Sequence, residues 1–257
     1  MGEIIVVASG KGGVGKTALT AGIGEALDSY DKKVLLIDTD MGLRNLDIAL
    51  GVENEVVFDV LDCIDGRCGI NDALIKISCK NGGLSFLPAA QSRGGKHADA
   101  EKFSSFCSGL KNDFDFIILD SPAGLGIGLS SCCCDSAIVV VQPYIASVRD
   151  ADRCIDILER NNISGLKLVI NGVRPELISK GIMWNVDDIV DLLGIPLLGI
   201  VPFDDELLKG ALANKQSIAF EAFGNIAGRM AGENIPVIDI NRKKIGLTDR
   251  IKKFLKK

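Results

Sequence analysis

Short apolar runs alternate along the chain with longer amphipathic segments. The apolar runs are rich in Val, Ile and Leu and are bounded by charged or turn-forming residues, a pattern typical of strands buried on both faces. We predict strands at residues 4–8, 33–37, 84–87, 116–119, 137–141, 166–170 and 197–200. Helical periodicity predicts helices at residues 17–28, 98–110, 148–160, 186–193 and 219–231. This alternation predicts an α/β fold with a doubly wound, mostly parallel sheet flanked by helices.

The composition agrees with such a sheet. Hydrophobic residues make up 47% of the 257 residues and aromatic residues only 5%, so the predicted core is large and mostly aliphatic. The longest apolar runs, such as residues 137–141, are far too short to cross a bilayer. We therefore predict one domain, residues 1–241, followed by a tail of different composition, residues 242–257.

The loop after the first predicted strand matches the pattern G-x-x-x-x-G-K-[ST] in full. Its residues are Gly10, Lys11, Gly12, Gly13, Val14, Gly15, Lys16 and Thr17. Glycines allow the backbone to wrap a phosphate, and the helix that follows presents its positive end to it. We predict that this loop and Ala18 bind ATP, that Lys16 reaches the β- and γ-phosphates, and that the Thr17 hydroxyl binds Mg²⁺.

Lys11 is a second lysine at the start of the same loop. A lysine at this place marks the deviant Walker A class, in which it reaches across a dimer to the phosphates held by the partner. A cation supplied in this way makes dimerisation depend on the charge of ATP. We predict this role for Lys11 in an ATP-bound homodimer.

Carboxylates follow two other predicted strands. Asp38 and Asp40 end the second strand two residues apart, so their side chains are expected to face the same way. We predict one in the Mg²⁺ shell, Asp38, and one that acts on the attacking water, Asp40. Asp120 ends an apolar strand, which is the Walker B pattern, and is predicted to assist Mg²⁺ binding.

Two residues at later strand ends are candidates for the nucleotide base. An Asn such as Asn171 can donate to and accept from an adenine edge. Pro202, with its neighbours Val201 and Phe203, is predicted to flank the same base.

The tail reverses the charge of the chain. Residues 242–257 contain eight Lys or Arg and one Asp, a charge of +7, whereas the whole chain carries −5 and the remainder therefore −12. On a helix, four apolar residues share one face, and Lys252 and Lys253 lie opposite with Lys256. The apolar four are Leu247, Ile251, Phe254 and Leu255.

A basic amphipathic helix of this kind is typical of a segment that lies on an anionic membrane surface. One such tail is expected to bind marginally, whereas two tails on one dimer bind much more tightly because the second binding event is intramolecular. The predicted cycle is that ATP forms the dimer, the dimer holds the membrane, and hydrolysis releases it. We expect no nucleic-acid partner, because an acidic body repels a polyanion.

Eight cysteines are present, and we expect no signal peptide, which favours reduced thiols in the cytoplasm over a disulfide framework. His97 is the single histidine, and this argues against a zinc site. Cys132, Cys133 and Cys134 form a run for which the sequence suggests no role.

At four places the chain resembles the MinD family of bacterial septum-site determining ATPases. These are residues 4–17, residues 37–47 with the stretch G-L-R-N-L-D, residues 120–124 and residues 147–153. The P-loop is shared by the wider MinD/ParA class, whereas the other stretches and the basic tail are narrower signals. The resemblance extends over nearly the whole chain.

The resemblance implies a cytoplasmic ATPase, peripheral on the inner face of the cell membrane, that recruits the division inhibitor MinC. MinE, or a topological partner such as DivIVA with MinJ, would set its position. Arg44, Asn45, Arg149 and Asp152 match a family region that contacts partners and the dimer interface, and Asp40 matches the position that orients the attacking water. Slow hydrolysis is expected without a partner.

The sequence departs from the family at Ala18, where a second Thr is common, and at Thr39, where a bulkier residue is common. Three other classes share the fold. A regulator of flagellar number, FlhG, has a similar tail but usually an added segment before the first strand. A ParA-type DNA partition ATPase requires a basic body. An iron–sulfur carrier requires a cysteine pair at the dimer axis, for which Cys132–Cys134 would be the candidates.

Overall fold

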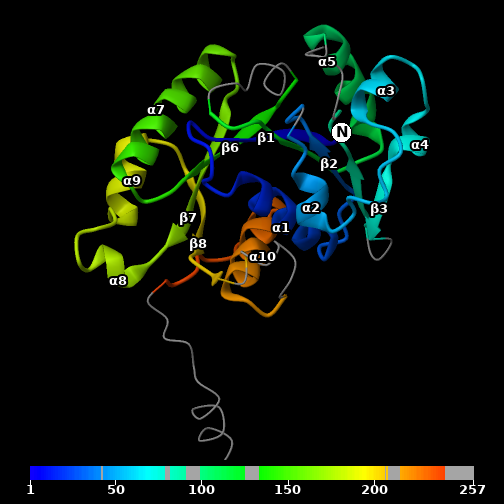
Figure 1. Ribbon diagram of the computed structural model, residues 1–257. Coiled ribbons are helices and arrows are strands. Elements are labelled where there is room, and N and C mark those ends of the chain that lie inside the picture. The colour runs from blue at the N-terminus through cyan, green and yellow to red at the C-terminus, as the bar shows by residue number, and fades with distance from the viewer. Residues whose placement is uncertain are drawn as a thin grey trace, which may run out of the picture.

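The computed structural model describes residues 1–41, 43–78, 82–90, 99–124, 133–205, 207 and 215–240. Within these residues the chain forms an eight-stranded sheet with helices on both faces (Figure 1). The strands are β1 Glu3–Ala8, β2 Val34–Asp38, β3 Ile75–Ser78, β4 Leu84–Leu87, β5 Phe116–Asp120, β6 Ser136–Val141, β7 Gly165–Val173 and β8 Leu197–Pro202. Their order in the sheet is β3-β4-β2-β5-β1-β6-β7-β8.

The helices differ widely in length. The longer ones are α1 Lys16–Asp28, α5 Ala100–Gly109, α7 Ile145–Arg160, α9 Val186–Leu193 and α10 Ile218–Met230. The short ones are α2 Leu46–Leu50, α3 Val60–Ile64, α4 Ile70–Ala73 and α8 Pro175–Ile178, and the 3-10 helix Leu110–Asn112 follows α5. No helix among the described residues is long and apolar enough to span a membrane.

All seven predicted strands and the five predicted helices are confirmed, with small shifts at their ends. The predicted helix at 148–160 begins earlier, at Ile145, and the one at 98–110 begins at Ala100, where the Asp99 side chain accepts a hydrogen bond from the backbone N–H of Glu101. Residue 98 lies outside the described residues.

One strand of the sheet was not predicted. β3 pairs antiparallel with β4 at the edge of the sheet, with an irregularity between Lys76 and Ser78. Its four residues include an exposed Lys76, so it lacks the apolar run that identifies the inner strands. The helices α2, α3, α4 and α8 have four or five residues, too few to show a helical period.

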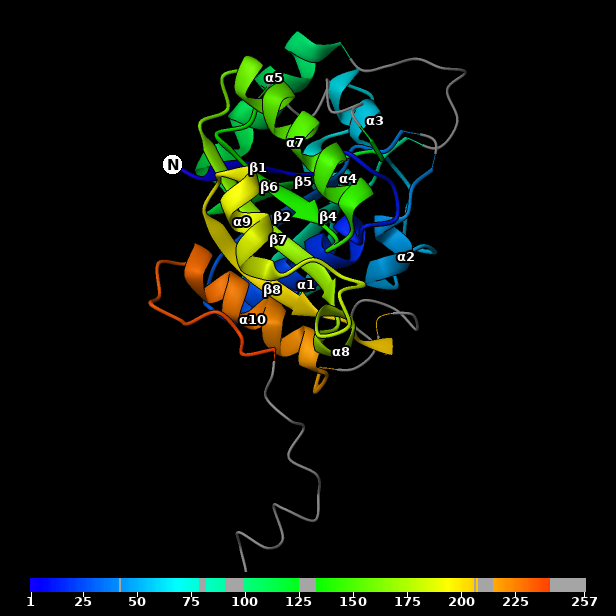
Figure 2. The ribbon, with the colours of Figure 1, turned by 90° about the vertical axis from the view of Figure 1, so that its left-hand side faces the viewer.

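The strand residues divide into two cores. One set, which includes Ile4, Val6 and Ile37, packs with α3, α5, α7 and α9. The alternate set, which includes Ile5, Val7 and Leu36, packs with α1, α2 and α10. Figure 2 shows the sheet between these two helical layers. Because both faces are covered, every residue of the inner strands β1, β2, β5 and β6 except Glu3 is buried.

α1 approaches α10 closely at a glycine. A Cβ placed on Gly22 would lie 2.1 Å from Cδ2 of Phe223, whose side chain is 1% exposed. Gly224 of α10, by contrast, has open space where a Cβ would stand. The absence of a side chain at Gly22 therefore lets the two helices pack against each other.

Replacing either glycine by alanine tests this packing. Gly22→Ala gains up to ~1 kcal/mol of helix propensity but overpacks Phe223, which costs ~1–3 kcal/mol, so we expect a lower free energy of unfolding. The matched variant Gly224→Ala keeps the propensity gain without the clash and should raise it. Urea unfolding of both variants checks this, and a stabilised Gly22→Ala protein would contradict the packing argument.

Candidate functional site

The carboxyl ends of β2, β5 and β1 meet at the centre of the sheet. Asp38 pairs in register with Asp120, and Asp120 pairs with Val7 of β1. The loops that follow these strands are therefore neighbours, as expected where parallel strands bind a ligand. Asp38 is 1% and Asp120 is 2% exposed, so two acidic side chains are buried side by side.

The loop from Ser9 to Gly15 connects β1 to α1 and has the backbone of a phosphate-binding loop. Gly13 and Gly15 have φ values of 76° and 95°, in the region that favours glycine. A Cβ on Gly10 would lie 1.8 Å from the carbonyl oxygen of Asp150. Two kinds of constraint, backbone conformation and close approach, thus require glycine in this loop.

The two lysines of the loop have different environments. Lys16 is 7% exposed, and its Nζ donates a hydrogen bond to Ser9 Oγ at 3.0 Å. Burial lowers the Lys16 pKa, and the nearby charges of Asp120 and Asp40 oppose this. Lys11 is exposed, and its carbonyl accepts a hydrogen bond from Ser9 Oγ at 2.7 Å. Lys16 is thus directed into the site of its own chain, whereas Lys11 lies on the surface.

Asp38 joins the end of β2 to the loop that follows. Its carboxylate accepts hydrogen bonds from the backbone N–H groups of Asp40, Asn45 and Leu46, at 2.9, 3.2 and 3.2 Å. Burial raises the pKa of Asp38 to about 6, although these hydrogen bonds act in the opposite direction. Asp40 is partly exposed. Its pKa is raised because of burial, and the charge of Lys16 opposes this effect in part.

Asp120 faces the first turn of α1. The Thr17 hydroxyl donates a hydrogen bond to its carboxylate, and Thr20 Oγ1 lies 3.5 Å from Oδ1. Burial raises the pKa of Asp120 to about 7, and the neighbouring Asp38 adds to the effect. Hydroxyl and carboxylate oxygens gathered in one buried place are the donors that Mg²⁺ prefers, so Thr17, Asp38 and Asp120 fit the ion that the sequence predicts.

Asn171 lies against the phosphate-binding loop. Its Nδ2 donates to the carbonyl of Val14 at 2.7 Å, and a Cβ on Gly15 would lie 2.3 Å from the same nitrogen. The side chain therefore supports the loop from β7. Pro202 ends β8, next to Val173 in register. The adenine contacts predicted for Asn171 and Pro202 remain predictions.

The sequence analysis missed three features near this site. Ser9 is the hydrogen-bond partner of Lys16, and Thr20 is a second hydroxyl beside Asp120. The Arg174 guanidinium stacks over the Phe203 ring, 3.4 Å from its centroid, next to Pro202. Ser9 could have been identified from its place between a strand and the glycine loop, whereas the other two depend on contacts between distant segments.

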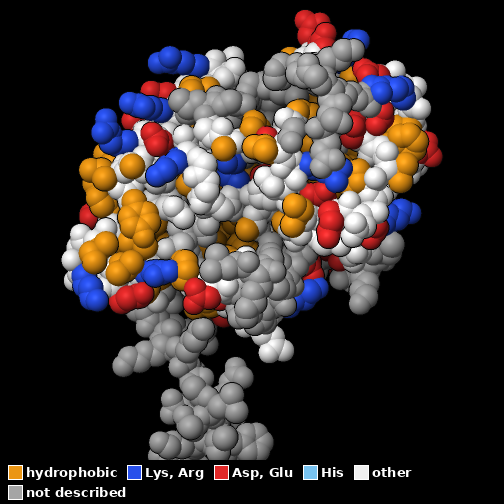
Figure 3. Space-filling model, in the orientation of Figure 1, with side chains coloured by type: hydrophobic (Ala, Val, Ile, Leu, Met, Phe, Trp, Pro, Cys, Tyr) orange, Lys and Arg blue, Asp and Glu red, His pale blue; other side chains and the backbone are white. Residues whose placement is uncertain are grey.

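The predicted partner residues lie in two places. Arg44 is largely buried and forms an ion pair with Asp47 at 2.5 Å, while Asn45 is exposed at the start of α2. Arg149 and Asp152 are exposed on α7, where Figure 3 shows a group of basic side chains. The predicted membrane residues Leu247, Ile251, Lys252, Lys253, Phe254 and Leu255 lie outside the described residues.

Large apolar side chains are exposed in the segments that follow β2 and β6. Leu43 and Ile48, after β2, are 71% and 63% exposed, and Tyr144 and Ile145, after β6, are 40% and 59% exposed. Large apolar side chains with this much exposure are candidates for contact with another protein.

Three comparisons place the chain among known proteins. A family model described as the CobQ/CobB/MinD/ParA nucleotide binding domain matches residues 5–218. The septum site-determining protein MinD of Synechocystis sp. is 43% identical over 264 residues, which cover 99% of each chain.

Two solved structures are similar as well. One is from a MinC:MinD cell division protein complex of Aquifex aeolicus, with a TM-score of 0.84 and 40% identity over 92% of this chain and 99% of that one. The other is the septum site-determining protein MinD complexed with Mg-ADP from Pyrococcus horikoshii OT3, with a TM-score of 0.77 and 28% identity over 90% and 96%.

The contact between Asn171 and Val14 predicts how a variant should behave. Asn171→Ala removes a hydrogen bond worth ~1 kcal/mol, so we expect about fivefold weaker binding of ATP and of GTP alike, measured by calorimetry. Asn161→Ala is the matched control, because its Nδ2 also donates to a backbone carbonyl, that of Ile157 at 2.7 Å, at the far end of α7. A loss for ATP alone would instead favour a base contact by Asn171.

Proposed function

This chain belongs to the MinD family of nucleotide-binding ATPases, and from that premise we propose that it is an ATP-dependent dimerising ATPase that associates with a membrane and positions the site of cell division. It recruits a MinC-like division inhibitor, and a MinE-like or a DivIVA/MinJ-type factor sets its position. The solved complex of MinC with a similar MinD supports the first partner. The curated relatives at 36–43% identity are MinD proteins, which favours this function over a flagellar regulator or a DNA partition ATPase.

The observation that carries the proposal is the contrast between the two loop lysines. Lys16 is buried with Asp40 and Asp120 among its charged neighbours, so it serves the phosphates bound by its own chain. Lys11 is exposed and serves the phosphates bound by the partner. The exposed Leu43, Ile48 and Ile145, in the segments after β2 and β6, give such a dimer apolar surface to bury.

Each remaining group has a role in the proposed reaction. Bound through Thr17, Asp38 and Asp120, Mg²⁺ would neutralise charge on the β- and γ-phosphates. The partly exposed Asp40 orients the attacking water. Lys16 of one chain and Lys11 of the other stabilise negative charge on the same phosphates from two sides. Hydrolysis removes the γ-phosphate that both lysines share, and the dimer separates.

The basic tail connects this cycle to the membrane. One tail binds weakly, and the ATP dimer presents two, so membrane binding follows the nucleotide state. The acidic remainder of the chain leaves the tail as the part that an anionic surface attracts.

Deleting residues 245–257 tests the role of the tail. The full chain should sediment with anionic liposomes in ATP and much less in ADP, because only the dimer carries two tails. The truncated chain should lose sedimentation and retain ATP binding. Liposomes of neutral lipid serve as the control, and sedimentation of the truncated chain with anionic liposomes in ATP would refute the proposed attachment.

Lys11→Ala tests the dimer independently. Loss of a charge-assisted contact worth ~1.5–3 kcal/mol should weaken ATP-dependent dimerisation by about tenfold or more, measured by analytical ultracentrifugation. ATP should still bind the monomer through Lys16. Lys180→Ala, which removes an exposed lysine after α8, is the control. If Lys11→Ala dimerises as the parent chain does, the role across the dimer is wrong.

A further inference from the structure

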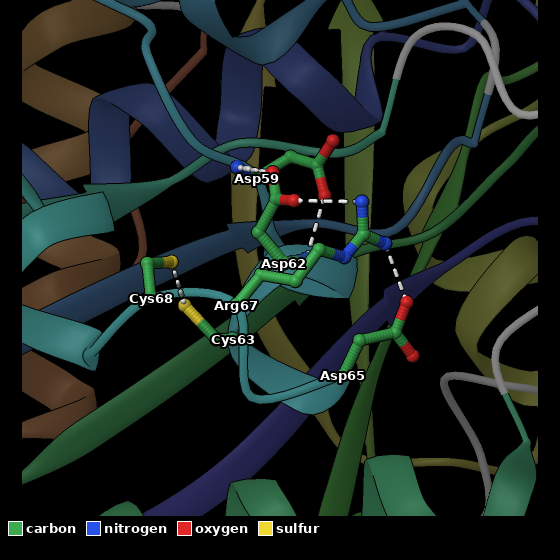
Figure 4. A network of polar contacts seen from close by, with 6 residues as sticks. All are labelled: Asp59, Asp62, Cys63, Asp65, Arg67 and Cys68. Atoms are coloured by element: carbon green, nitrogen blue, oxygen red, sulfur yellow. Dashed lines mark hydrogen bonds and ion pairs between the residues drawn. The ribbon is translucent and has the colours of Figure 1, made fainter.

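Two cysteines lie close together at the end of α3. The Sγ atoms of Cys63 and Cys68 are 3.7 Å apart, and both residues are partly exposed (Figure 4). Neither residue has a part in the proposed ATPase cycle. Their proximity depends on how α3 begins and ends.

The start of α3 is held by a pair of reciprocal hydrogen bonds. The Asp59 side chain accepts from the backbone N–H of Asp62 at 3.0 Å, and the Asp62 side chain accepts from that of Asp59 at 3.1 Å. This capping box places Cys63 in the last turn of a short, well-defined helix.

The end of α3 reverses the chain. Gly66 has a φ of 71°, and its N–H donates to the carbonyl of Cys63 at 3.1 Å. The N–H of Arg67 donates to the carbonyl of Asp62 at 2.8 Å. A glycine with positive φ at the end of a helix turns the backbone back over the last helical turn. This turn brings Cys68 beside Cys63.

The side chain of Arg67 holds the turn from outside. Its guanidinium binds Asp62 at 3.2 Å and Asp65 at 2.5 Å, one carboxylate at each end of the turn (Figure 4). Exposed ion pairs contribute little to stability singly, but a guanidinium bound on two sides restricts the turn between the sulfurs. The reacting distance is thus set by the fold before any oxidation.

We propose that Cys63 and Cys68 form an oxidisable dithiol that reacts with hydrogen peroxide to give an intramolecular disulfide. The reaction needs the two sulfurs to approach from 3.7 Å to about 2.0 Å. Redox-sensing pairs typically consist of an accessible cysteine beside a second cysteine that resolves its oxidation product. The inference does not depend on the proposed ATPase cycle.

The two sulfurs have different roles in this step. Burial raises the pKa of Cys63 to about 12, and the hydrogen bond with Cys68 adds to the effect. Cys63 therefore keeps its proton, and a hydrogen bond joins its sulfur to that of Cys68. Cys68 is the thiol that reacts with peroxide, and Cys63 is the one that resolves the product.

The electrons balance without another reactant. The Cys68 thiolate attacks one peroxide oxygen, the O–O bond breaks, and water leaves after protonation, which gives a sulfenic acid on Cys68. The sulfur of Cys63 then attacks that of Cys68, the S–O bond breaks, and hydroxide leaves with the Cys63 proton as a second water. In total, two thiols and one peroxide give one disulfide and two waters.

Other cysteines among the described residues are less suited. Cys107 and Cys154 are fully buried, so peroxide does not reach them readily. Cys133 and Cys134 are partly exposed and serve as the internal comparison.

The sequence allows a direct assay, because Arg67 lies between the two cysteines. The nearest other basic residues are Arg44 and Lys76, so trypsin releases residues 45–67 and 68–76, each with one cysteine. After treatment of the full chain with equimolar peroxide and alkylation of free thiols, mass spectrometry should find these two peptides linked, and reduction should separate them. The link should form at least about tenfold faster than any disulfide between chains, because two thiols of one chain react at a millimolar or higher effective concentration.

Variants separate the roles. Cys63→Ser should remove the link and leave a sulfenic acid on Cys68 that dimedone labels, whereas Cys68→Ser should remove the link and leave Cys63 unlabelled.

Arg67→Lys keeps the trypsin site and should slow the link about tenfold, since a lysine cannot bind both carboxylates in a fork. Cys134→Ser is the control and should form the link at the rate of the parent chain. Absence of the linked peptides, or labelling of Cys63 in Cys68→Ser at the rate of Cys68 in Cys63→Ser, would overturn the proposal.

Discussion

Burial of Asp38 and Asp120 side by side is the constraint around which the rest of the site is arranged. The parallel register of β2 and β5 pairs Asp38 with Asp120 at the carboxyl ends of the two strands. Burial raises the pKa of both acids, and the charge of Asp38 adds to the effect at Asp120. The fold offsets the cost with three backbone N–H groups on Asp38, with the Thr17 hydroxyl on Asp120, and with Lys16 close by. A divalent cation would offset this cost further. The two buried carboxylates that are unfavourable for the protein alone therefore favour binding of a nucleotide with its metal ion.

The same loop directs its second lysine outward. Lys16 is buried with acidic residues among its charged neighbours, whereas Lys11 is exposed on the surface. In the proposed dimer this gives ATP a role in assembly as well as in chemistry. In the same proposal, membrane attachment through two basic tails depends on the nucleotide, because avidity amplifies a weak contact.

Glycine has a different physical role at each place where the chain needs it. Gly15 takes a positive φ and leaves room for the Asn171 amide, Gly22 leaves room for the Phe223 ring, and Gly66 reverses the chain after α3. The first shapes the phosphate loop, the second lets two helices pack, and the third sets two sulfurs 3.7 Å apart. The proposed dithiol thus depends on a local turn, whereas the nucleotide site also depends on contacts between distant segments such as Asn171 and Val14.

The sequence by itself determined the inner strands, the longer helices, the phosphate loop and the acids at the strand ends, because these depend on local period and on residues close along the chain. It also identified Lys11 as unusual and the tail as basic and amphipathic. Only the tertiary structure decided that Asn171 supports Val14, that Arg44 is held by Asp47, that Arg174 stacks on Phe203, and that β3 adds an antiparallel edge. The pairing of Cys63 with Cys68 likewise required the structure, because a spacing of five residues brings two side chains together only when a turn such as that at Gly66 reverses the chain between them. Such contacts depend on where separate segments meet in space, which the period of a single segment does not encode.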